Sequence, residues 1–210
     1  MKIKHNHCTQ DKKRAAFTLI EMIGVLAVIA ILAALLIPKV FNAINEARIN
    51  NAAVNLSTVK TAVVDHFGKY GRFDMVWGTN ALTPIPNLGY DTNVLMVEQL
   101  LDKPFAAKIA GGDGSTNCVI QLVTGANANG GTGYFLDGGT NNATANAQYV
   151  VEAVLYNVAQ ADAKDLNDRV DGATLGVALG AADNKGRIEW ANPGSVQAPI
   201  NALYVYLTHR

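Results

Sequence analysis

Residues 12–38 read KKRAAFTLIEMIGVLAVIAILAALLIP, and this stretch decides how the rest of the chain is interpreted. From Phe17 to Ile37 it contains 21 residues, of which only Glu21 is charged. As a helix, such a segment is about 31 Å long at ~1.5 Å per residue. That length matches a hydrocarbon core of roughly 30 Å. The stretch therefore predicts a membrane-spanning helix.

Basic residues lie before this apolar segment. Lys12, Lys13 and Arg14 precede it directly, whereas Lys39 alone follows it closely. The first sixteen residues carry a net charge of +4 and the remaining residues carry −4. The positive-inside rule then places the N-terminus in the cytoplasm and residues 39–210 outside it. The mildly acidic remainder gives no electrostatic case for a nucleic-acid partner.

A secretory signal peptide is the competing interpretation of the same residues, with a basic start, an apolar stretch and a small-residue cleavage site near Ala33-Ala34. The apolar stretch is long for a signal peptide, however, and no A-x-A motif ends it. Glu21 is also unexpected in a plain signal or anchor, because a carboxylate at mid-membrane costs roughly 2.5–3.5 kcal/mol on insertion scales. Such a charge usually has a partner.

The segment from Lys12 to Pro38 resembles the processing motif of type IV prepilins and type II secretion pseudopilins. That pattern is a basic leader, a small residue, then Phe-Thr-Leu-Ile-Glu opening an apolar helix. The resemblance implies that a prepilin peptidase cuts between Ala16 and Phe17 and N-methylates Phe17. The residue before the cut is usually glycine in this family, and here it is Ala16.

The resemblance also assigns roles to two residues within the helix. Glu21 corresponds to the glutamate five residues into the mature chain, and Pro38 corresponds to the proline that kinks the helix after the apolar stretch. Because cleavage leaves a cationic amine on Phe17, a neighbouring subunit's Glu21 is expected to pair with it and set the axial register of a filament.

The remainder predicts an α+β, pilin-like fold, in which the long N-terminal helix packs on an antiparallel sheet. Apolar residues recur at spacings near three and four up to about Tyr70, and Gly68 and Gly71 give a stop. We therefore divide the chain into a leader (1–16), a membrane and filament-core helix (17–38), an amphipathic half of that helix (39–70) and a globular domain (71–210). Alternating apolar residues predict four strands, at Cys118–Thr124, Tyr149–Asn157, Gly186–Trp190 and Ala202–Thr208.

Other segments are predicted from their composition. Residues 71–93 are loop-like, Leu95–Leu101 favours a short helix capped by Asn93, and Asp162–Val170 favours another helix ending near Gly172. The Gly/Asn-rich stretch Gly125–Ala147 has no apolar period and predicts an exposed loop.

No constellation indicates an enzyme site, a cofactor or a metal. Asp162, Asp165, Asp168 and Asp171 suggest a calcium loop but fail the EF-hand pattern, so a solvated polar helix is the preferred interpretation. The histidines show no metal spacing. Cys118 is expected to be a buried core thiol, and packing is the preferred role of Trp77 and Trp190.

The sequence thus predicts a structural subunit of a type IV pilus or a type II secretion pseudopilus. Its expected partners are a prepilin peptidase, identical or related subunits and the inner membrane, before it enters a periplasmic or cell-surface filament. The lone Cys118 departs from the disulfide-closed loop of many type IV pilins, which favours a pseudopilin or a pilin lineage without the bridge. The alternatives are a membrane-anchored module that binds surfaces through residues 125–147 and, less favoured, an anchored enzyme.

Overall fold

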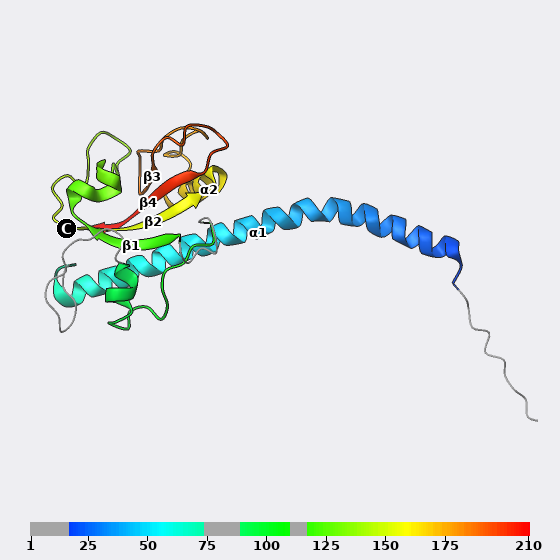
Figure 1. Ribbon diagram of the computed structural model, residues 1–210, viewed down its shortest axis with the longest axis horizontal. Coiled ribbons are helices and arrows are strands. Elements are labelled where there is room, and N and C mark those ends of the chain that lie inside the picture. The colour runs from blue at the N-terminus through cyan, green and yellow to red at the C-terminus, as the bar shows by residue number, and fades with distance from the viewer. Residues whose placement is uncertain (1–16, 74–88, 110–116) are drawn as a thin grey trace, which may run out of the picture. The chain divides into compact units, whose positions relative to one another are not determined.

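The computed structural model describes residues 17–73, 89–109 and 117–210. The chain divides into two compact units, Met1–Ala43 and Ile44–Arg210. Helix α1 (Leu19–Tyr70) is continuous across this division. The predicted long helix is therefore confirmed, and together with a four-stranded antiparallel sheet it forms an α+β, pilin-like architecture (Figure 1).

The second half of α1 packs through one apolar stripe. Ile49, Ala52, Leu56, Val59 and Val63 alternate spacings of three and four, and each is at most 4% exposed. This spacing places them on one face of the helix, and they join the core that also contains the sheet.

The end of α1 lies where the glycine signal predicted it. The helix stops at Tyr70, and the Gly71 N–H donates to the Phe67 carbonyl at 2.7 Å. Gly71 has φ +69°, a left-handed conformation that a residue without Cβ adopts at little cost.

The sheet is entirely antiparallel, with the strand order β1-β2-β4-β3. All four predicted strands are present, and each of their ends lies within two residues of the predicted bound. Their bounds are β1 Cys118–Val123, β2 Val150–Val158, β3 Ile188–Trp190 and β4 Ile200–His209.

Each strand contributes alternate side chains to two faces of the sheet. On the inner face, residues such as Ile120, Leu155 and Leu203 are fully buried in the core shared with α1. The intervening positions on the outer face include the polar residues Gln121 and Glu152, which also lie in the interior of the protein.

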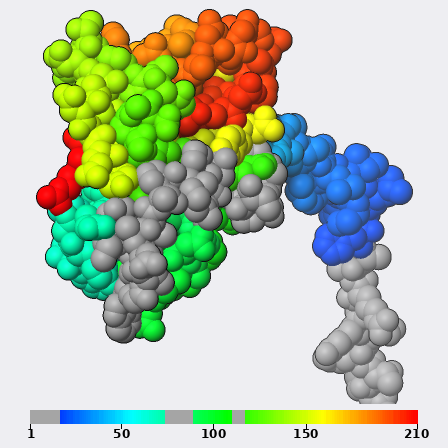
Figure 2. Space-filling model, turned by 60° about the vertical axis from the view of Figure 1, so that its left-hand side comes forward, coloured from blue at the N-terminus to red at the C-terminus, as the bar shows by residue number. Residues whose placement is uncertain are grey.

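The outer face is buried because residues 125–147 cover it. The prediction of an exposed loop therefore holds only in part, since about half of these residues are exposed and others are buried against the sheet. This segment starts with the 3₁₀ helix η2 (Gly125–Gly131), and its residues Ala128, Tyr134 and Thr144 are completely buried. A second apolar cluster joins them to the strands. The yellow-green atoms of this segment form part of the surface in Figure 2. The composition was uninformative because the segment is anchored by a few buried polar contacts and has no apolar period.

The helix predicted at 95–101 is wrong in place and type. The structure has a π-helix, η1 (Asp91–Leu95), which is followed by turns, and the predicted cap Asn93 lies within it. The Met96 N–H donates to the Asp91 carbonyl at 2.8 Å, and the Asp91 carboxylate accepts the Phe105 N–H at 2.7 Å. The first bond is local to the π-helix, whereas the second is a tertiary contact that local propensity does not encode. Residues 74–88 of the predicted loop at 71–93 lie outside the described residues.

The second predicted helix is confirmed with a shifted start. Helix α2 (Gln160–Val170) begins two residues before the predicted Asp162. It is followed by Gly172 at φ +86°. Buried Ala163 and Leu166 attach it to the core.

Candidate functional site: the N-terminal segment

The start of α1 is held by a reciprocal cap between Thr18 and Glu21. Glu21 Oε2 accepts the Thr18 N–H at 2.8 Å and the Thr18 hydroxyl at 2.9 Å, while the Glu21 N–H donates to Thr18 Oγ1 at 3.3 Å. This is the capping-box arrangement, which satisfies N–H groups that a helix start otherwise leaves unpaired. Its Thr-x-x-Glu pattern is present in the sequence and signals this cap, which the predicted intersubunit role of Glu21 does not include.

The cap leaves part of the Glu21 carboxylate available. Both bonds from Thr18 end on Oε2, and Oε1 accepts no hydrogen bond from the residues that the structure describes. The residue is exposed, as is Phe17 at 79%. Within the described residues, Glu21 therefore holds the helix start and leaves Oε1 without a hydrogen-bond donor.

The first part of α1 presents apolar side chains on all sides. Every large apolar residue from Phe17 to Ile44 is at least 43% exposed. An 18-residue window in α1 has a mean hydropathy of 2.8 and none of it is buried, so by length and composition the helix is able to cross a membrane. A soluble surface helix buries one apolar stripe, whereas this segment needs lipid or other helices around it.

The other two residues of the predicted site are Ala16 and Pro38. Ala16 lies outside the described residues. Pro38 lies inside α1, which continues through it. Because proline lacks an N–H, the Ala34 carbonyl loses its usual helical partner at this point. The roles predicted for Ala16 in cleavage and Pro38 in kinking stay predictions.

Two of the four aspartates that suggested a calcium loop make separate contacts. Asp168 pairs with Lys164 at 2.7 Å on α2, and Asp171 Oδ2 accepts the N–H groups of Arg187 and Ile188 at 2.7 and 2.9 Å. Within the described ranges, no group of three or more His, Cys, Asp or Glu residues has a metal-binding arrangement.

The other singled-out residues pack in the core. Cys118 is 9% exposed on β1, and its Sγ lies 3.5 Å from the Phe105 carbonyl oxygen. Trp190 is 4% exposed on β3, and its indole N–H donates to the Ala181 carbonyl at 3.0 Å. Both packing predictions are confirmed, whereas Trp77 lies outside the described residues.

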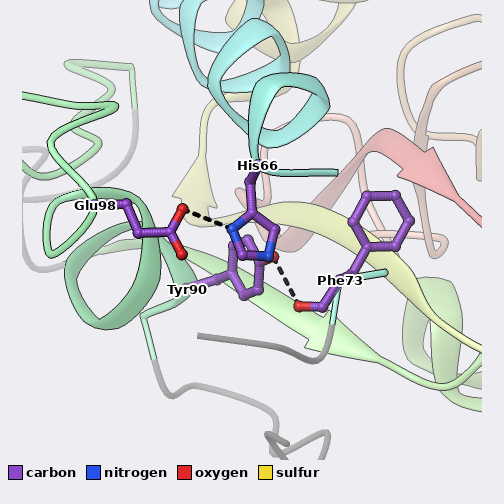
Figure 3. A network of polar contacts seen from close by, with 4 residues as sticks. All are labelled: His66, Phe73, Tyr90 and Glu98. Atoms are coloured by element: carbon purple, nitrogen blue, oxygen red, sulfur yellow. Dashed lines mark hydrogen bonds and ion pairs between the residues drawn. The ribbon is translucent and has the colours of Figure 1, made fainter. Parts of the chain in front are cut away.

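His66 forms a buried pair that the sequence did not reveal. Its Nδ1 lies 2.9 Å from Glu98 Oε2, and both side chains are at most 1% exposed. Figure 3 shows the imidazole between Glu98 and the ring of Tyr90, whose hydroxyl donates to the Phe73 carbonyl at 2.9 Å. The pair joins α1 to the turn after η1 within a closed interior, so its evident role is structural.

Two further carboxylates anchor the cover of the sheet. Glu152 accepts the Asn129 N–H at 2.9 Å and the Tyr134 hydroxyl at 2.8 Å. Glu189 accepts the Asn129 side-chain amide at 2.6 Å and the Phe135 N–H at 2.9 Å. Burial raises the pKa of Glu152, and it raises the pKa of Glu189 to about 8 against the opposing hydrogen bonds. Both residues are fully buried, and they hold residues 125–147 on the sheet.

Comparison with known proteins gives one family match. Residues 11–37 match the family described as the prokaryotic N-terminal methylation motif. No curated protein and no solved structure matches the chain. The matched residues include the basic cluster, the capping box and most of the exposed apolar helix. The chain therefore carries the N-terminal methylation motif that is the hallmark of the type IV prepilin and pseudopilin family.

Proposed function

We propose that this protein is a structural subunit of a type IV pilus or a type II secretion pseudopilus. In this proposal a prepilin peptidase cuts between Ala16 and Phe17 and methylates the new amine of Phe17. The observation that carries the proposal is that the methylation motif at residues 11–37 opens a helix whose large apolar side chains up to Ile44 are all exposed. Such a surface suits the membrane before assembly and the packed helices of a filament core afterwards.

The capping box supports a specific task for Glu21. Before cleavage, Phe17 has a neutral peptide N–H, and Thr18 holds the carboxylate near the helix start. After cleavage, the neighbouring amine is cationic, and Oε1 of Glu21 is free to accept it. An ion pair in a low-dielectric filament core is worth more than one in water and cannot be replaced by solvent. The ion pair would form only in the axial register that brings the amine of the next subunit to Glu21. It would therefore stabilise that register over others.

The place of action follows from the same helix. The prepilin is held in the inner membrane by the first part of α1, with its C-terminal unit outside the cytoplasm. The assembled subunit then belongs to a periplasmic or cell-surface filament with identical or related subunits. The chain acts as a building block and not as an enzyme.

The direct test is the N-terminus of material sheared from cells. Intact mass and N-terminal sequencing should give a chain that begins with N-methyl-Phe17. A chain that retains Met1, or one cut near Ala34, would refute the proposal. A retained Met1 on a monomer in the membrane is the result expected of a membrane-anchored binding module.

A second experiment separates processing from assembly. Glu21→Val should still be cut before Phe17, because the scissile bond and the basic leader are intact, while sheared filaments are lost. Glu46→Val is the matched control, since this exposed glutamate lies on α1 outside the motif. Normal filament yield from Glu21→Val would show that the carboxylate has no role in assembly.

A further inference from the structure

A shallow pocket on the C-terminal unit has a strongly basic rim, and we call it the basic pocket. It has a volume of about 270 Å³ and lies between α1, the end of α2 and β4. Lys60, Arg169 and Arg187 line it, and apolar residues such as Leu56 and Val205 also contribute to its walls. Three cations therefore surround a cavity large enough for an incoming side chain.

These cations are only partly compensated within the described residues. Lys60 has no hydrogen bond or ion pair with any described residue, and Arg169 donates to the neutral Asn50 side chain. Arg187 is 47% exposed, and its Nε lies 3.9 Å from Asp171 Oδ1. Burial and the charge of Arg187 both lower the pKa of Lys60. Each effect disfavours the protonated lysine, so the pocket gains from any anion that enters it.

An acidic pair lies on the same unit, on α2. Asp165 is exposed and Asp162 is partly exposed, one turn apart on the helix. Burial and the charge of Asp165 raise the pKa of Asp162, while Arg48 opposes them. Within the described part of the chain, no ion pair joins these aspartates to the basic pocket. The acidic pair and the basic pocket thus carry opposite charge, which Arg48 and Asp171 compensate only in part. Both include residues of α2, where Asp165 precedes Arg169 of the pocket by four residues.

We propose that the basic pocket of one copy binds the Asp162–Asp165 pair of a second copy, as a contact between neighbouring subunits. The inference rests on the proposed function, since it names a lateral contact of the same filament. Each copy carries both surfaces, so the contact is head-to-tail and can repeat without closing, as a filament requires. Opposite charges at such a contact chiefly set register and exclude wrong arrangements.

Charge reversal with rescue tests this contact in the full chain. Lys60→Glu and Asp165→Lys should each reduce sheared filaments by about tenfold, because each places like charges opposite one another. The double variant restores the attraction and should recover most of the wild-type yield. Lys69→Glu is the matched control, an exposed lysine of the same helix that does not line the pocket. Subunit level and the Phe17 N-terminus should be unchanged in every variant.

Cross-linking gives a readout that does not depend on filament yield. Ser57 lines the basic pocket and is exposed. A chain with Ser57→Cys and Asp165→Cys, treated with a short bismaleimide, should give a ladder of multimers that neither single variant gives. The inference is overturned if the double charge variant stays defective or if no ladder forms. It is also overturned if both single reversals assemble like Lys69→Glu. A wild-type chain that retains Met1 would instead refute the proposed function.

Discussion

The titration of Glu189 predicts an unusual pH dependence of stability. The pKa of this carboxyl rises from 4.5 to about 8 on folding, with burial as the main cause. Between these values the folded protein holds a proton that the unfolded chain has released. By linkage, the free energy of unfolding falls as pH rises, at up to about 1.4 kcal/mol per pH unit for this one group. From pH 6 to pH 8 the loss amounts to roughly 2 kcal/mol.

The perturbation that isolates this effect is Glu189→Gln, which cannot titrate. The amide keeps one acceptor, but its NH₂ faces either Asn129 Nδ2 or the Phe135 N–H, since both donate to the carboxylate. That conflict costs about 1–3 kcal/mol at all pH values. The constant difference in free energy of unfolding between the two proteins therefore does not test the titration of Glu189. The slope of the free energy of unfolding against pH does. The variant should show a flatter stability profile between pH 6 and 8.

The assay is urea unfolding of the full chain in detergent, monitored by tryptophan fluorescence in a Trp77→Phe background. Trp190 then reports on β3, where it directly follows Glu189. Asp183, whose pKa burial raises to about 6, titrates at the lower end of this window, and its charge also raises the pKa of Glu189. The slope is therefore read between pH 7 and 8. Groups common to both proteins cancel in the difference between the two profiles. Parallel profiles would refute the reasoning, because they would mean that the bonds from Asn129 and Phe135 keep Glu189 ionised despite burial.

Three further predictions follow from other contacts. Thr18→Ala removes the cap on α1 and should cost about 1 kcal/mol of helix stability. The loss should appear as faster amide hydrogen exchange in the first turn of α1. Unchanged exchange would contradict the capping role. His66→Phe leaves Glu98 Oε2 buried without its hydrogen-bond partner and should lower the free energy of unfolding by about 1–3 kcal/mol. The double variant His66→Phe/Glu98→Leu should recover part of this loss. Equal free energies of unfolding for the single and double variants would contradict a stabilising His66–Glu98 contact. Cys118 should react with a maleimide only after unfolding, so rapid labelling of the native chain would contradict its burial.

The match between predicted and observed elements depends on how local the signals are. The long helix up to Tyr70 and the four strands are encoded by apolar spacing and by glycines at the ends, and these signals act within a few residues. The π-helix η1 depends on Asp91 accepting the Phe105 N–H, a contact over fourteen positions. No local window contains that information.

The sequence by itself determined the methylation motif at residues 11–37 and the apolar helix that it opens, because both are contiguous stretches of the chain. Only the tertiary structure decided that residues 125–147 cover the sheet, since their anchors Glu152 and Glu189 lie far along the chain from one another. Only the tertiary structure paired His66 with Glu98 and brought Lys60 to Arg187. The physical reason is that polar side chains interact only when they lie a few ångströms apart. For residues far apart in the sequence, that distance is set by the tertiary fold.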